Sequence, residues 1–171
     1  MTKIAVFGSA FNPPSLGHKS VIESLSHFDK VLLLPSISHA WGKQMLDYQI
    51  RCQLLDAFIS DLALENVERS RVEERLHKPD ESVTTYAVLS SLTTSFPDAD
   101  ITFVLGPDNL FNFSKFYNAK EITERWNVLA CPERVKVRST DIRNAILQGE
   151  SVETLTTPSV ATLLQQGKYY R

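Results

Sequence analysis

The sequence has little cysteine, no excess of either charge and no long hydrophobic run. Its two cysteines, Cys52 and Cys131, lack Cys-x-x-Cys spacing, so we expect two buried small side chains, with no disulfide framework or zinc site. The first apolar run stops at Gly8, so we expect no signal peptide. No run approaches the roughly 20 apolar residues that a membrane helix needs. These features together predict a cytoplasmic protein without a membrane partner.

The charge balance also limits the class of ligand. Lysine and arginine number 18, aspartate and glutamate 20, which gives a formal net charge of −2. This balance argues against broad contact with a nucleic-acid backbone, although it leaves room for a small basic pocket. The length of 171 residues predicts a single domain, residues 1–171, with a core that needs no cross-links.

Short apolar runs alternate with helical patterns along the chain. Almost continuous apolar runs, typical of strands buried on both faces, occupy residues 3–8, 30–36, 100–106 and 126–132. A more exposed strand is expected within residues 65–75, whose mixed charges otherwise predict a solvated face, and a short last strand at 135–139. Helical spacing begins near Ser15 and recurs over residues 48–62, 83–92, 120–124, 140–147 and 158–165.

This alternation predicts an α/β fold of the Rossmann-like, doubly wound type. Its sheet should be mainly parallel, with helices on both faces. Ligands bind such sheets at the carboxyl ends of the strands, often where the strand order reverses. We therefore expect the site among the residues that follow the strands, and three segments qualify: the loop after Phe7, the segment PSISHAWGK and the segment GPDN.

The segment GSAFNPPSLGH, residues 8–18, joins the first strand to the first helix. Gly8 permits a tight turn, the two prolines delay the helix and Ser15 is a candidate N-cap. The helix start should offer free backbone N–H groups and a partial positive charge to an anion. His18 lies in the first turn, where a cation is disfavoured unless a phosphate accepts its hydrogen bond. The alternative is a packed histidine with a satisfied ring nitrogen.

A second segment, VRSTDIRNAI, poses the same question near the end of the chain. Ser139 or Thr140 is the expected N-cap, and Asp141 suits the first turn of a helix. Arg143 in that turn is unfavourable for the helix dipole, whereas its planar guanidinium suits phosphate oxygens. The alternative is an exposed arginine paired with Asp141 or Glu133.

These two segments resemble the two signatures of the nucleotidylyltransferase superfamily. The first signature is matched by Gly8, Phe11, Asn12, Pro13, Gly17 and His18, and the second by Ser139, Thr140, Ile142 and Arg143. Two positions depart from the pattern, since Ser15 replaces the first histidine and Arg138 the leading serine.

Further stretches resemble the nicotinate/nicotinamide mononucleotide adenylyltransferases over nearly the whole chain. Lys43 and Arg51, Ser82 and Thr84, and Gly106 and Asp108 match that family's segments, and Phe116 replaces its tryptophan near the pyridine ring. Only the residues ERVK separate the strand at 126–132 from the second signature, where the family has some tens of residues. Pantetheine-phosphate adenylyltransferase and a non-catalytic nucleotide-binding relative remain alternatives.

The resemblance implies adenylyl transfer from ATP to a pyridine mononucleotide in NAD biosynthesis, with small molecules as the partners. It assigns catalysis to His18, Arg143 and Lys43. It assigns ATP to Gly8, Ser9, Ala10, Phe11, Ser15, Gly17, His18, Gly106, Asp108, Ser139, Thr140 and Arg143. It assigns the pyridine mononucleotide to Ser9, Lys43, Thr84, Phe116 and Trp41. Mg²⁺ should arrive with the ATP phosphates rather than in a protein cage, so no metal-binding residue is named. The choice between nicotinate and nicotinamide and the oligomeric state stay open.

Overall fold

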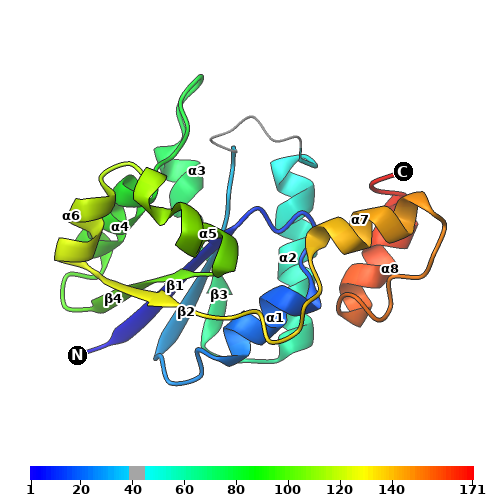
Figure 1. The fold of residues 1–171 in the computed structure, drawn as a ribbon, viewed down its shortest axis with the longest axis horizontal. Coiled ribbons are helices and arrows are strands. Elements are labelled where there is room, and N and C mark those ends of the chain that lie inside the picture. Colours follow the sequence, from blue (N-terminus) through cyan, green and yellow to red (C-terminus); the bar gives the residue numbers. More distant parts are fainter. Residues whose placement is uncertain (39–44) are drawn as a thin grey trace.

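A parallel sheet forms the centre of the molecule (Figure 1). The computed structural model describes residues 1–38 and 45–171, and within them five strands lie in the order β3-β2-β1-β4-β5. Their bounds are β1 Lys3–Ser9, β2 Lys30–Pro35, β3 Val67–Arg69, β4 Asp100–Leu105 and β5 Asn127–Ala130. The chain runs outward from β1 to β3 and then returns to the other side of β1. The strand order therefore reverses between β1 and β4, where such sheets bind ligands.

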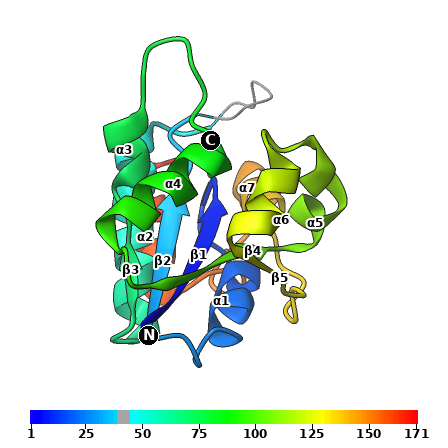
Figure 2. The same ribbon diagram turned by 90° about the vertical axis from the view of Figure 1, so that its left-hand side faces the viewer.

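Helices cover both faces of the sheet because side chains alternate along each strand (Figure 2). Ala5 and Phe7 of β1 belong to a core shared with α1, α2, α7 and α8. Ile4 and Val6 belong to a second core shared with α3, α4 and α6. The helices are α1 Leu16–Glu23, α2 Tyr48–Leu62, α3 Val72–Leu76, α4 Thr85–Ser95, α5 Pro107–Asn112, α6 Ala119–Arg125, α7 Ser139–Leu147 and α8 Pro158–Gly167, with a 3-10 turn η1 Phe113–Lys115.

The predicted Rossmann-like architecture is confirmed, and α2 has the predicted bounds. The short strand expected at 135–139 is wrong, because residues 131–138 form an irregular β5–α7 segment. The Val137 carbonyl in this segment accepts hydrogen bonds from Gly17 and Ser15, so it is bound to α1 and not to a sheet edge. The region 65–75 holds only a three-residue strand, followed by α3. None of the described helices has the length and hydrophobicity needed to cross a membrane.

Candidate active site

A cavity of about 740 Å³ opens at the carboxyl ends of β1 and β4, within the usual range of ligand pockets. It is lined by 14 of the residues predicted above: Gly8, Ser9, Ala10, Phe11, Ser15, Gly17, His18, Thr84, Gly106, Asp108, Phe116, Ser139, Thr140 and Arg143. Lys43 and Trp41, the other two predicted residues, lie outside the described residues. The cavity thus brings together predicted residues from segments that lie up to 135 positions apart, from Gly8 to Arg143.

Hydrogen bonds join the two signature segments at the cavity. In the β1–α1 loop (residues 10–15), the Asn12 carbonyl accepts from Arg143 Nη1 at 2.8 Å, and the Pro13 carbonyl accepts from Ser139 Oγ at 2.6 Å. In the opposite direction, Ser15 Oγ donates to the Val137 carbonyl at 3.0 Å. The serine that replaces the family histidine therefore connects α1 to the β5–α7 segment.

The glycines of the first signature have different roles from those expected. A Cβ on Gly17 would lie 2.2 Å from the Val137 carbonyl oxygen, so only glycine permits this contact. The tight turn expected at Gly8 is wrong, because Gly8 lies within β1 and has ordinary space for a Cβ. The left-handed residue of the loop is Phe11, with φ of 47°. Its buried ring lies against His18, with centroids 4.7 Å apart.

His18 lines the cavity as a neutral ring with both nitrogens hydrogen-bonded. The Ser15 backbone N–H donates to Nδ1 at 3.0 Å, so Nδ1 carries a lone pair and the ring proton is on Nε2. Nε2–H then donates to Ser9 Oγ at 3.0 Å. Burial lowers the pKa of His18 to about 4, so at neutral pH the ring can offer a phosphate a hydrogen bond but no positive charge.

The free N–H groups expected at the start of α1 are already bonded to protein. Leu16 N donates to the Leu155 carbonyl, Gly17 N to the Val137 carbonyl and His18 N to Ser15 Oγ. The expectation was wrong because distant carbonyls reach this helix end.

The start of α7 differs from that of α1. Its N-cap is Arg138, not Ser139 or Thr140, and the Arg138 N–H donates to the Asp141 carboxylate at 2.8 Å. The N–H groups of Ser139 and Thr140 have no acceptor within residues 1–38 and 45–171. Available backbone donors therefore lie at α7, together with the positive end of its dipole.

Arg143 has neither of the carboxylate partners considered from the sequence. Besides the Asn12 carbonyl, it donates from Nη2 to Thr140 Oγ1 at 3.1 Å. In the described part of the chain no carboxylate forms an ion pair with it. Since a guanidinium has five N–H donors, this partly buried group keeps both its charge and further donors for a ligand.

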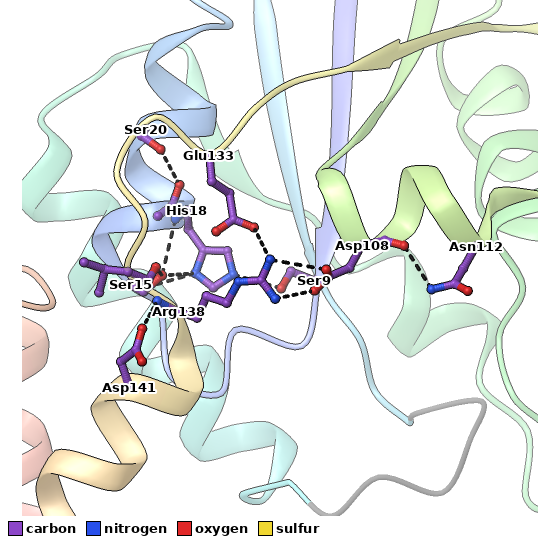
Figure 3. A network of polar contacts seen from close by, with 11 residues as sticks. Ser9, Ser15, His18, Ser20, Asp108, Asn112, Glu133, Arg138 and Asp141 are labelled. Atoms are coloured by element: carbon purple, nitrogen blue, oxygen red, sulfur yellow. Dashed lines mark hydrogen bonds and ion pairs between the residues drawn. The ribbon is translucent and has the colours of Figure 1, made fainter.

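Asp108 is paired with Arg138 (Figure 3), and both residues line the cavity. Arg138 Nη1 and Nη2 lie 2.9 and 3.2 Å from the two Asp108 carboxylate oxygens. Glu133 Oε1 lies 3.7 Å from the same guanidinium. The predicted partner of a ribose is thus already engaged by the residue that replaces the family's leading serine.

Two buried charged residues near the cavity did not stand out as such in the sequence. Glu73, expected on a solvated face, is only 9 % exposed, lines the cavity and accepts the Ile37 N–H at 3.3 Å. Burial raises the pKa of Glu73 to about 7, while the Ile37 N–H and the charge of Arg51 act to lower it. Arg51 is 1 % exposed and donates to the carbonyls of Ala10, Ser36 and Leu46. A helical period of 3.6 residues places Glu73 on the apolar side of α3 with Val72 and Leu76. This spacing is the feature of the sequence from which the burial of Glu73 could have been predicted.

The predicted pyridine-side residues have mixed environments. Thr84 caps α4, its Oγ1 accepting the Ala87 N–H at 3.1 Å. Phe116 packs on Phe113 and Phe103, with ring centroids 5.3 and 6.1 Å away, while it also lines the cavity. Within the described residues, no three histidine, cysteine, aspartate or glutamate side chains gather to hold a metal ion.

Comparisons with known proteins agree with this geometry. The model of the cytidylyltransferase-like family matches residues 6–145. A crystal structure from Vibrio parahaemolyticus, provisionally named a nicotinate-nucleotide adenylyltransferase, is 61 % identical, with a TM-score of 0.90 over 100 % of this chain and 96 % of that one. A Myxococcus xanthus protein with the same provisional name is 27 % identical over 98 % of this chain and 94 % of its own length. Plasmodium falciparum nicotinic acid mononucleotide adenylyltransferase complexed with NaAD shares the fold at 12 % identity, with a TM-score of 0.79 over 99 % of this chain and 98 % of that one.

Proposed function

This chain belongs to the cytidylyltransferase-like family, and from that premise we propose that it transfers the adenylyl group of ATP to nicotinate mononucleotide. The 5′-phosphate oxygen of the mononucleotide forms a bond to the α-phosphorus of ATP. The bond from that phosphorus to the oxygen that bridges to the β-phosphate breaks, and pyrophosphate leaves. The names of the relatives support nicotinate over nicotinamide as the acceptor, and the product is the dinucleotide of NAD biosynthesis.

One observation carries the proposal: Arg143 and the start of α7 face the same cavity as His18, where the strand order reverses. The reaction needs no protein nucleophile, because alignment and charge stabilisation supply the catalysis. The donors must therefore converge on the triphosphate, and the hydrogen bonds between the two signature segments hold them together.

The roles of the phosphate-side residues follow from their donors. Arg143 binds the β- and γ-phosphates and the departing pyrophosphate through its charged guanidinium. Lys43, which the family resemblance assigns to the same phosphates, lies outside the described residues. The N–H groups of Ser139 and Thr140 add neutral donors. His18 Nε2–H donates to a phosphate oxygen in place of Ser9 Oγ, and Ser9, whose oxygen already accepts the Phe11 N–H, donates its own proton.

ATP enters as its magnesium complex, so Mg²⁺ is part of the substrate. Magnesium keeps several waters and phosphate ligands. Among the carboxylates that line the cavity, Asp108 is paired with an arginine. On the nucleoside side, Asp108 accepts the ribose hydroxyls once Arg138 has released it. Thr84 and Phe116 surround the pyridine ring, where an aromatic face stacks; Lys43 and Trp41 are assigned to this side by family resemblance.

The test is pyrophosphate release from magnesium–ATP with nicotinate or nicotinamide mononucleotide in parallel. We expect negligible pyrophosphate release when both mononucleotides are omitted, and faster turnover with nicotinate mononucleotide than with nicotinamide mononucleotide. Arg143→Ala should lower kcat/KM about 100-fold or more, because a preorganised charged donor is lost. Arg134→Ala, which removes an exposed arginine from the β5–α7 segment, is the matched control. Activity of Arg143→Ala within a few-fold of the wild type would contradict the phosphate assignment.

A further inference from the structure

Three successive carbonyls of the β1–α1 loop accept hydrogen bonds from donors in the last third of the chain. The carbonyls of Asn12, Pro13 and Pro14 accept from Arg143, Ser139 and Thr156, the last at 2.8 Å. Two of these loop residues are prolines, which have no N–H to donate. The position of the loop therefore depends on what the residues after 138 supply.

The side chain of Asn12 is bound just as closely as its carbonyl. Asn12 is 2 % exposed, and its Oδ1 accepts the Leu46 N–H at 3.2 Å and the Tyr170 hydroxyl at 2.5 Å. Asn12 thus connects Tyr170 with Arg143 through one residue, since Arg143 donates to its carbonyl.

The tail after α8 (residues 168–171) adopts a demanding conformation that brings Tyr170 to this place. Lys168 and Tyr170 both have left-handed backbones, with φ of 52° and 64°, a region that non-glycine residues enter at a cost. Gly167 leaves room for the Tyr169 ring, because a Cβ at position 167 would lie 2.3 Å from that ring. Burial raises the pKa of Tyr170, while the charges of Arg143 and Arg51 act to lower it, so the hydroxyl keeps the proton that it donates.

We propose that Tyr170 is a positioning residue for adenylyl transfer, acting through Asn12 to hold the β1–α1 loop and the guanidinium of Arg143 at the triphosphate. The inference rests on the proposed function and adds the tail to the machinery of the site. Tyr170 does not line the cavity itself, so its effect passes through Asn12. Without the hydroxyl, the Leu46 N–H is the remaining donor to Asn12 Oδ1 among the described residues, and the loop samples orientations in which Arg143 is misaligned.

Tyr170→Phe tests this by removing one hydroxyl and keeping the buried ring. We expect kcat to fall about tenfold, the worth of one well-placed hydrogen bond, with the KM values for both substrates within about twofold. Tyr169→Phe is the control, because the Tyr169 hydroxyl has no hydrogen-bond partner among the described residues. Thermal unfolding of both variants should remain cooperative. A kcat for Tyr170→Phe equal to that of Tyr169→Phe would overturn the proposal.

A double-mutant cycle shows whether the effect passes through Asn12. In an Asn12→Ala background, Tyr170→Phe should cause no further loss of kcat, and an undiminished tenfold loss there would also overturn the proposal.

Amide hydrogen exchange gives a readout that does not depend on activity. The Phe11 and Ser15 amides, which bond to Ser9 Oγ and His18 Nδ1, should exchange faster in Tyr170→Phe than in Tyr169→Phe. If the wild type releases no pyrophosphate, the proposed function fails, and this exchange still decides whether the tail holds the loop; equal exchange would overturn it.

Discussion

At the scale of single residues, the arginine at position 138 changes what the neighbouring carboxylate can bind. The Arg138–Asp108 pair has both side chains largely in solvent, 51 % and 71 % exposed, so it is easily broken: exposed pairs contribute about 0–1 kcal/mol. A ribose that needs Asp108 must compete with this pair.

Arg138→Ser should therefore lower the KM for ATP by about two- to fivefold, the equivalent of an exposed ion pair, and leave kcat near the wild-type value. Steady-state kinetics with ATP varied at saturating mononucleotide measure this. Lys136→Ser, which removes a positive charge from the same exposed segment, is the control for a general electrostatic effect. A raised KM would mean that Arg138 itself contacts the nucleotide.

At the scale of elements, the contact between α1 and the β5–α7 segment assembles the site. Gly17 allows the Val137 carbonyl to approach the first turn of α1, where it accepts from Gly17 N at 3.1 Å and from Ser15 Oγ. The segment then leads directly into α7 and its donors. The Val137 carbonyl of this short irregular connection thereby occupies a backbone donor at the start of α1 that a ligand could otherwise use.

Gly17→Ala should push these two elements apart, because the new Cβ would meet a backbone oxygen that cannot rotate away. We expect a loss of stability of about 1–3 kcal/mol, as for other overpacked sites, and a loss of activity beyond that of an equally destabilised variant. Denaturant unfolding gives the first quantity and pyrophosphate release the second. Gly106→Ala, where a Cβ would meet open space, should keep wild-type stability. Equal stability of the two variants would contradict the close contact.

At the scale of the whole molecule, buried charges fasten the ends of the strands to the helices. Arg51 of α2 binds carbonyls that follow β1 and β2, and Glu73 of α3 binds the backbone just beyond β2. A buried carboxyl disfavours its charged form, which the raised pKa of Glu73 expresses. The stability of the fold must then depend on pH.

The sign follows from proton binding. The folded state keeps the proton of Glu73 up to about pH 7, whereas the unfolded chain releases it near 4.5. The contribution of Glu73 to stability is therefore full below pH 4.5 and is lost as the pH rises through 7, by up to about 3 kcal/mol. His18 acts oppositely, since its lowered pKa costs stability as the pH falls from 6.5 towards 4.

Glu73→Gln keeps the acceptor for the Ile37 N–H and removes the titration. The difference in free energy of unfolding, variant minus wild type, should rise between pH 5 and 8 and then level off. Because both proteins contain His18, that residue cancels from the difference. Urea unfolding at several pH values measures it, and a difference that stays constant across this range would show that Glu73 does not titrate there.

The alternation of strands and helices, the parallel direction of the sheet and the segments that line the cavity could all be predicted from the amino-acid sequence. These features follow from local patterns: apolar runs bounded by glycine and proline, helical spacing, and signatures such as those around His18 and Arg143. Such patterns depend on neighbours a few positions away, so they can be recognised in the sequence before the fold is known.

Which polar groups remain available to a ligand depends instead on the folded arrangement of the chain. The carbonyls of Val137 and Leu155 accept from the first N–H groups of α1, whereas those of Ser139 and Thr140 at the start of α7 have no acceptor among the described residues. Asp108 is paired with Arg138, and Asn12 accepts from Tyr170. Each of these contacts is a hydrogen bond or ion pair between segments 30 to 158 positions apart. The local sequence around a donor or acceptor is the same whether or not a distant segment forms a hydrogen bond with it. The packing of the chain therefore decides which donors and acceptors are already paired.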